Sequence, residues 1–165
     1  MEKQYAMILF FGLGLLLVPR SLLFAEESTA APQTVRYKLV KAARAFLDLP
    51  YRWGGMSEKR GADCSGLVKM IFARLHINLP RTSREQIESG EDVPIDKLEV
   101  GDLVFFSSQG EIPSHVGLYI GNRQFLHAEK KAGRVIITDL KQPWYAKRFL
   151  GARRIKDLSK NEETF

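Results

Sequence analysis

The stretch that decides the fold is residues 62–75, which read ADCSGLVKMIFARL. Asp63 is a good N-cap, so the pattern predicts a helix that begins around Asp63 or Cys64. The apolar residues that follow recur at helical spacing and form one buried face; they are Leu67, Val68, Ile71, Phe72 and Leu75. The sequence therefore places Cys64 in the first turn of a helix that packs on a core.

Cys64 is the single cysteine of the chain, so it cannot form an internal disulfide. By count alone it reads as an inert, small core residue. Its place in the first helical turn favours chemistry instead, because free N–H groups and the helix dipole stabilise a thiolate and lower its pKa. The same N–H groups could hold an oxyanion, and Ser65 and Gly66 leave room for a substrate backbone. We therefore interpret Cys64 as a nucleophile.

Helical patterns dominate the first half of the chain and strand patterns the second. Thr34–Leu49 predicts a helix ended by Pro50, and Thr82 or Ser83 caps a short helix to about Glu88. Short β-type runs follow at 103–106, 116–120, 124–127 and 135–138, with a hairpin signal at Gly121-Asn122 and a last strand within 148–155. This order predicts an α+β fold in which N-terminal helices pack on a central antiparallel β-sheet.

The two ends of the chain read as accessory segments. Residues 1–25 carry Lys3 and an apolar run from Ala6 to Val18, which indicates a secretory signal peptide or an uncleaved N-terminal anchor. We expect a linker at 26–33, one domain at 34–156 and a polar tail at 157–165. Export predicts a periplasmic or secreted protein of the cell envelope, with membrane contact only if the first segment is uncleaved.

Composition points to one folded domain with a basic surface. Of the 165 residues 45% are hydrophobic and 27% charged, and the formal net charge is +6 with a pI near 9.5. Such a surface suits polyanions such as teichoic acids, anionic lipid or acidic cell-wall stems. Nucleic acid is disfavoured, because no run of Lys and Arg with interleaved aromatic residues occurs.

A nucleophilic cysteine needs a base and a group that orients the base, and the chain has three histidines. His115 opens one strand pattern and His127 lies in the next. If the two strands pair as a hairpin, these side chains lie roughly opposite each other and could hydrogen-bond on one face. His76 has no such partner and reads as structural. A zinc site of Cys64, His115 and His127, with Asp102 as a further ligand, stays an alternative, although no local ligand pair supports it.

Six short segments, in this order and spacing, carry a resemblance to a known family. The chain resembles the NlpC-type family of papain-like cell-wall cysteine peptidases from about Val35 to Ile155, and most of all its single-domain, Spr-like murein endopeptidases. Members of that group are usually lipoproteins, and the lipid-bearing cysteine is missing here, so outer-membrane attachment does not carry over. The matching segments are Tyr51–Gly55, Asp63–Gly66, Leu79–Ser83, Gly101–Phe106, Ser114–Tyr119 and Phe125–Ala128.

The resemblance implies roles for single residues. Cys64 is then the nucleophile, His115 the base and His127 the orienting third member, while Tyr51 lines the site and helps polarise the scissile carbonyl. Asp63 and Ser65 match positions that shape the cleft near the peptide stem. For Tyr51, Asp63 and Ser65 alike, a structural reason such as a helix cap, packing or solvent contact explains the residue equally well. The Trp53-Gly54-Gly55 and Gly101-Asp102 turns read as scaffold.

The implied reaction hydrolyses a peptide bond in a peptidoglycan stem or crosslink, through a thioester and without any cofactor. Two bonds fit: γ-D-glutamyl to diaminopimelate, and D-alanyl to diaminopimelate. We expect a monomer. A non-catalytic wall-binding protein, and acyltransferase or amidase chemistry on the same triad, stay open as alternatives.

Overall fold

The computed structural model describes residues 31–156 and 158. The helices are α1 (Ala31–Arg44), α2 (Cys64–Ala73), α3 (Ser83–Gln86), α4 (Pro143–Ala146) and the 3₁₀ helix η2 (Ile95–Lys97). The strands are β1 (Met56–Ser57), β2 (Gly61–Ala62), β3 (Glu91–Asp92), β4 (Leu103–Phe106), β5 (His115–Gly121), β6 (Gln124–Glu129), β7 (Arg134–Asp139) and β8 (Phe149–Arg154).

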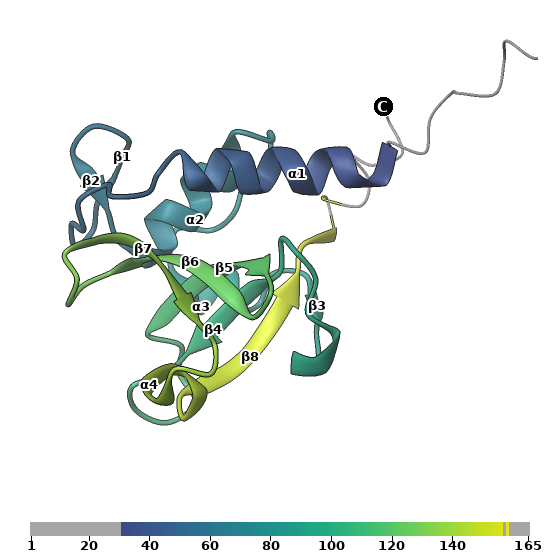
Figure 1. Ribbon diagram of the computed structural model, residues 1–165. Coiled ribbons are helices and arrows are strands. Elements are labelled where there is room, and N and C mark those ends of the chain that lie inside the picture. The colour runs from purple at the N-terminus through teal and green to yellow at the C-terminus, as the bar shows by residue number, and fades with distance from the viewer. Residues whose placement is uncertain (1–30, 157, 159–165) are drawn as a thin grey trace, which may run out of the picture.

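Six strands form one antiparallel sheet in the order β3-β8-β4-β5-β6-β7, and β1 and β2 pair separately. Helices α1 and α2 lie on one side of this sheet and α4 on the other (Figure 1). The expected α+β fold, with N-terminal helices packed on an antiparallel sheet, is confirmed. The hairpin expected at Gly121-Asn122 is confirmed as the β5–β6 connection.

The sheet has an apolar cluster on each face. The larger one lies between the helices and the sheet and contains Leu39, Leu67, Ile71 and Phe72. The smaller one lies on the α4 side and contains Phe106, Phe125 and Tyr145. Because side chains alternate along a strand, Val116, Leu118 and Ile120 face the first cluster, while Tyr119 and His115 face the second side.

Helix α1 starts at Ala31 instead of Thr34 and ends at Arg44 instead of Leu49. The early end has a tertiary cause: the N–H of Asp48 donates to the carbonyl of Val135, and the N–H of Val135 donates to the carbonyl of Leu49. The backbone after Arg44 is thus bonded to the edge of the sheet. Helix periodicity could not foresee this competition.

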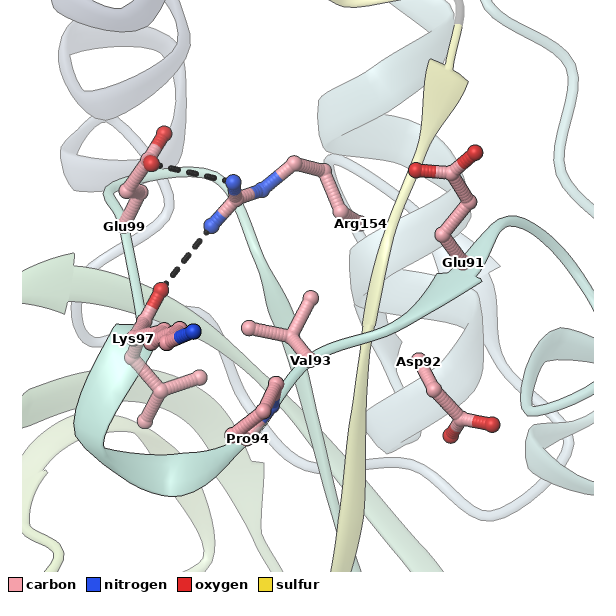
Figure 2. A pocket seen from close by; sticks show the side chains of 8 residues that line it. Glu91, Asp92, Val93, Pro94, Lys97, Glu99 and Arg154 are labelled. Carbon is pink, nitrogen blue, oxygen red and sulfur yellow. Dashed lines mark hydrogen bonds and ion pairs between the residues drawn. The ribbon is translucent and has the colours of Figure 1, made fainter.

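An ion pair between Asp102 and Arg154 stabilises the end of the sheet that lies far from the N-terminus of α2. Asp102 has a fully buried side chain, and both of its oxygens accept hydrogen bonds from Arg154 of β8 at 2.9 Å. The same guanidinium reaches the carboxylate of Glu99 at 2.9 Å and the carbonyl of Lys97 at 3.1 Å, as Figure 2 shows. These contacts confirm that the Gly101-Asp102 turn is scaffold.

The expected signal peptide or anchor at 1–25 lies outside the described residues, and so does most of the linker and tail. Within the described range, no helix is both long and apolar enough to cross a membrane.

Candidate active site

Cys64 is the first residue of α2, where the sequence placed it. The carboxylate of Asp63 accepts the N–H of Gly66 at 2.7 Å, which confirms the expected N-cap. The Cys64 side chain is half-buried. The backbone N–H groups of Cys64 and Ser65 lie close enough to the sulfur to stabilise its charged form, so the first turn of α2 surrounds it with donors.

Asp63 and Ser65, the neighbours of Cys64 in the chain, belong to a clamp formed by Arg81. Arg81 donates to both oxygens of Asp63, at 2.9 and 2.7 Å, to the Ser65 hydroxyl at 3.0 Å and to the Gly55 carbonyl at 3.2 Å. Asp63 also accepts the N–H of Gly54 at 3.0 Å. The clamp therefore ties the α2 N-terminus to the 54–55 turn.

This clamp buries both residues that were expected to shape the cleft. Asp63 is 9% exposed and Ser65 6%, and neither lines the cavity that Cys64 lines. Their substrate contact stays a prediction, whereas their structural role is visible. Arg81 was missed because a charge in a loop gives no sign of its partner 18 residues earlier.

His115 and His127 come together as the hairpin pattern predicted. His115 Nε2 and His127 Nδ1 lie 2.8 Å apart, on the same face of neighbouring strands. The β5–β6 register pairs Leu118 with Leu126, so the two histidines are diagonal neighbours and not directly opposite. His127 Nε2 lies 2.9 Å from Thr138 Oγ1 on β7, a contact that the sequence did not indicate.

Cys64 and His115 approach each other from opposite sides of the sheet. Cys64 begins the helix that packs on β5 and β6, while His115 projects from the α4 face at the first residue of β5. They meet at the end of the strand, where the N–H of Val116 contacts the Cys64 sulfur. Because His115 Nε2 is engaged by His127, Nδ1 is the nitrogen left for the cavity that both residues line.

Aromatic side chains enclose His127. Its ring stacks on Phe125 at 4.6 Å between centroids, and the edge-on contact with Tyr145 of α4 is at 5.2 Å. His127 is fully buried. Tyr145 was not identified from the sequence, because a four-residue helix after Pro143 has no readable period.

Burial keeps the resting site neutral. It lowers the pKa of His115 to about 4 and, with His115 as a second cause, the pKa of His127 to about 2. Burial also raises the pKa of the Cys64 thiol, against the N–H groups of Val116, Ser65 and Cys64, which lower it. The expected lowering of this pKa by the helix N-terminus is thus outweighed. At neutral pH Cys64 is therefore a thiol, and His115 and His127 are neutral imidazoles.

Tyr51 lies where the resemblance implied, on the wall of the same cavity. Burial, with the nearby Cys64 and Asp63, raises the pKa of its hydroxyl to about 12. The phenol is therefore protonated at neutral pH and is available as a hydrogen-bond donor.

The cavity around Cys64 and His115 has a volume of about 580 Å³. Two tryptophans flank it: Trp53 is 81% exposed and Trp144 43% exposed. The glycines beside Trp53 act as scaffold: Gly54 has a positive φ of 68°, and a methyl group at Gly55 would lie 2.7 Å from the Gly61 carbonyl oxygen. Trp53 itself lines the cavity. The remaining lining residues are Tyr51, Ser108, Ser114, Glu129, Lys130, Lys131 and Tyr145.

The zinc alternative finds no ligand cluster in the described part of the chain. No three His, Cys, Asp or Glu side chains there form a group that could hold a metal ion. Asp102, the fourth candidate ligand, has both oxygens engaged by Arg154.

A protein-family model matches this chain over the residues that form the site. The NlpC/P60 family model matches residues 48–154. The murein DD-endopeptidase MepS/murein LD-carboxypeptidase of Escherichia coli is 46% identical over 106 residues, which are 64% of this chain and 55% of that protein. The gamma-D-glutamyl-L-lysine dipeptidyl-peptidase of Bacillus subtilis is 36% identical over 138 residues, which are 79% of this chain and 46% of that protein.

A solved structure gives the same answer for the fold. The NlpC/P60 family protein from Bacillus cereus superposes with a TM-score of 0.69 at 36% identity, covering 72% of this chain and 39% of that one. This chain spans about half the length of the curated relatives it matches. With the fold, the papain-like arrangement and most of the described domain in agreement, the chain belongs to the NlpC/P60 family.

Proposed function

We propose that this protein is a cysteine endopeptidase that hydrolyses peptide bonds in peptidoglycan. One observation carries the proposal: Cys64 at the N-terminus of α2 and His115, held by His127 at 2.8 Å, line one cavity. A nucleophile, a base and a group that orients the base are the elements that acyl transfer requires.

The geometry supports the following sequence of steps. His115 Nδ1 accepts the thiol proton as the Cys64 sulfur attacks the carbonyl carbon. The negative oxygen that forms is met by the N–H groups at the α2 N-terminus and by the protonated Tyr51 hydroxyl. His115 then protonates the leaving amine, and a thioester remains. Water, deprotonated by His115, hydrolyses the thioester and regenerates the thiol.

The substrate proposal rests on the relatives and on charge. Relatives named as a murein DD-endopeptidase and a gamma-D-glutamyl-L-lysine dipeptidyl-peptidase share the domain, and the net charge of +6 suits an anionic wall polymer. We favour the crosslink between D-alanine and diaminopimelate, because the relative named as a DD-endopeptidase has the higher identity of the two. The place of action is then the cell envelope.

A cut at the γ-D-glutamyl bond within a stem is the second candidate. It is supported by the relative from Bacillus subtilis, whose alignment covers 79% of this chain.

The deciding experiment is digestion of purified, crosslinked peptidoglycan followed by mass spectrometry of the products, with Cys64→Ser as the blank. Conversion of crosslinked dimers to monomers would identify the crosslink, and release of shortened stems would identify the γ-D-glutamyl bond. Activity should survive EDTA and be lost with iodoacetamide. The reverse pattern would favour the zinc alternative, and no new product at all would refute the proposal.

A further inference from the structure

Thr138 extends the histidine pair to a third hydrogen-bonding group. It lies on β7, the edge strand, and its Oγ1 is 2.9 Å from His127 Nε2, while His127 Nδ1 is 2.8 Å from His115 Nε2. The Thr138 side chain makes no other hydrogen bond within the part of the chain that the structure describes. The result is a chain of three hydrogen-bonded groups, His115, His127 and Thr138, that runs across three strands from the cavity that Cys64 also lines.

The hydrogens of this chain can be arranged in two ways, because neutral imidazole carries one N–H and a hydroxyl both donates and accepts. In the first arrangement His127 is the Nε2–H tautomer: His115 Nε2–H donates to His127 Nδ1, and His127 Nε2–H donates to Thr138. In the second arrangement His127 is the Nδ1–H tautomer and every bond is reversed. Thr138 then donates to His127 Nε2, His127 Nδ1–H donates to His115 Nε2, and His115 carries its hydrogen on Nδ1.

Only the first arrangement serves the reaction. It leaves a lone pair on His115 Nδ1, which can take the Cys64 proton. It also suits the state after proton transfer, in which His115 carries hydrogen on both nitrogens and His127 Nδ1 must accept. In both states His127 holds its hydrogen on Nε2 and needs an acceptor there.

We propose that Thr138 is a positioning residue that supplies this acceptor and so fixes His127 in its Nε2–H tautomer. The proposal rests on the proposed function for its catalytic consequence, but the tautomer itself is a property of the folded protein.

The surroundings leave Thr138 as the group that fills this role. The titratable groups around the pair are Cys64 from α2, Glu129 at the end of β6 and Tyr145 from α4, and none of them is hydrogen-bonded to His127 Nε2 in the described residues. The ring of His127 stacks on Phe125, which offers no hydrogen-bonding group. Without the Thr138 oxygen, the buried Nε2–H loses its partner, and the reversed tautomer becomes the better one.

The test uses the whole protein with three variants. Thr138→Val removes the hydroxyl at nearly constant volume, Thr138→Ser restores it, and Ile136→Val is the matched control on the same face of β7, where Ile136 pairs with His127. Nitrogen NMR of the imidazole rings at pH 7 reads the tautomers without any substrate. The rate of Cys64 alkylation by iodoacetamide and the kcat for muropeptide cleavage read the consequence.

The expected result is an Nε2–H tautomer for His127 in the wild type, in Thr138→Ser and in Ile136→Val, and a shift to Nδ1–H in Thr138→Val. Alkylation and kcat should fall about tenfold in Thr138→Val with KM unchanged, the loss that follows from one unmade hydrogen bond. An Nδ1–H tautomer in the wild type would overturn the proposal even if no variant folded. Equal alkylation rates in Thr138→Val and Ile136→Val, or equal losses in the Val and Ser variants, would overturn it too. Failure of the wild type to cleave peptidoglycan would refute the proposed function and leave the tautomer result standing.

Discussion

Two cavities of similar size differ in what their polar groups do. The cavity at β3, η2 and Arg154, about 470 Å³, is lined by Glu91, Asp92 and Glu99, and each of these carboxylates forms an ion pair within the protein. Figure 2 shows the pair of Glu99 with Arg154. In the cavity of about 580 Å³ at the α2 N-terminus, the described residues offer no side-chain hydrogen bond to the Cys64 sulfur, and His115 is bonded through Nε2 alone.

The difference separates structural from reactive polar groups. Next to the first cavity, the buried carboxylate of Asp102 is saturated by Arg154 and the Glu99 N–H, so it fixes the fold and has nothing left to offer a ligand. A polar group that is positioned on one side and open on the other can do chemistry. The residue types alone would not show which cavity holds the reactive groups, since the cavity at β3 and η2 has more charged side chains.

The largest effect is expected when the side chain of Cys64, the proposed nucleophile, is removed. Cys64→Ala should reduce muropeptide cleavage by at least about 10⁴-fold, because no other group supplies the covalent step. The melting temperature should stay within a few degrees of wild type, since the side chain is half-buried and small. Chromatography of peptidoglycan digests measures the first and calorimetry the second. Activity within a few-fold of wild type would refute the nucleophile assignment.

The two histidines should differ in the size of their effects. His115→Ala should lower kcat about 10³-fold, since it removes the group that moves the proton. His127→Ala should lower kcat by about 10- to 100-fold, because water can replace part of an orienting group. Steady-state kinetics on one muropeptide measures both. Equal losses would contradict the division into base and orienting residue.

For the ion pair of Asp102 and Arg154, the expected effect of a substitution is on stability. Asp102→Ala removes the buried carboxylate that binds Arg154 at 2.9 Å and leaves the guanidinium only Glu99 and the Lys97 carbonyl. It should lower the free energy of unfolding by about 3 kcal/mol. Urea denaturation measures this. The kcat of the folded fraction should stay within about twofold of wild type, and a large loss of kcat with unchanged stability would erase the contrast between the two cavities.

Much of the fold could be predicted from the sequence, because its main elements have clear periods. Helix α2 has an N-cap followed by a regular apolar face, and β5 and β6 are joined by a Gly-Asn turn. The elements that escaped prediction are two- to four-residue pieces such as β3 and α4, in which no period can be recognised.

The site divides in the same way. Cys64, His115 and Tyr51 were identifiable because their roles follow from local position or from segments that the family shares. Arg81, Thr138 and Tyr145 act through contacts with residues remote in sequence: Thr138 reaches His127 across 11 residues and Arg81 reaches Asp63 across 18. The pKa of Cys64 was misjudged for the same reason, since burial depends on the whole fold and the helix dipole only on the local one.

The smallest effect expected is on the pH dependence of stability. It tests whether water is excluded from the His115–His127 pair as its contacts indicate. Burial lowers the pKa of His127 from the ordinary 6.5 to about 2, so below pH 6.5 the unfolded chain binds a proton that the native protein does not. Stability is therefore complete above pH 6.5 and falls as the pH drops, by up to about 1.4 kcal/mol per pH unit for this group. His115, with its pKa lowered to about 4, adds a slope of the same sign, so His127→Asn should remove only the share of His127 between pH 6.5 and 5. Urea denaturation at each pH measures this. The matched control is His76→Asn, at an exposed residue whose positive φ of 61° asparagine tolerates. An unchanged slope in His127→Asn would mean that His127 is protonated in the native state, and a protonated His127 could not accept the hydrogen bond from His115 on which the proposed mechanism depends.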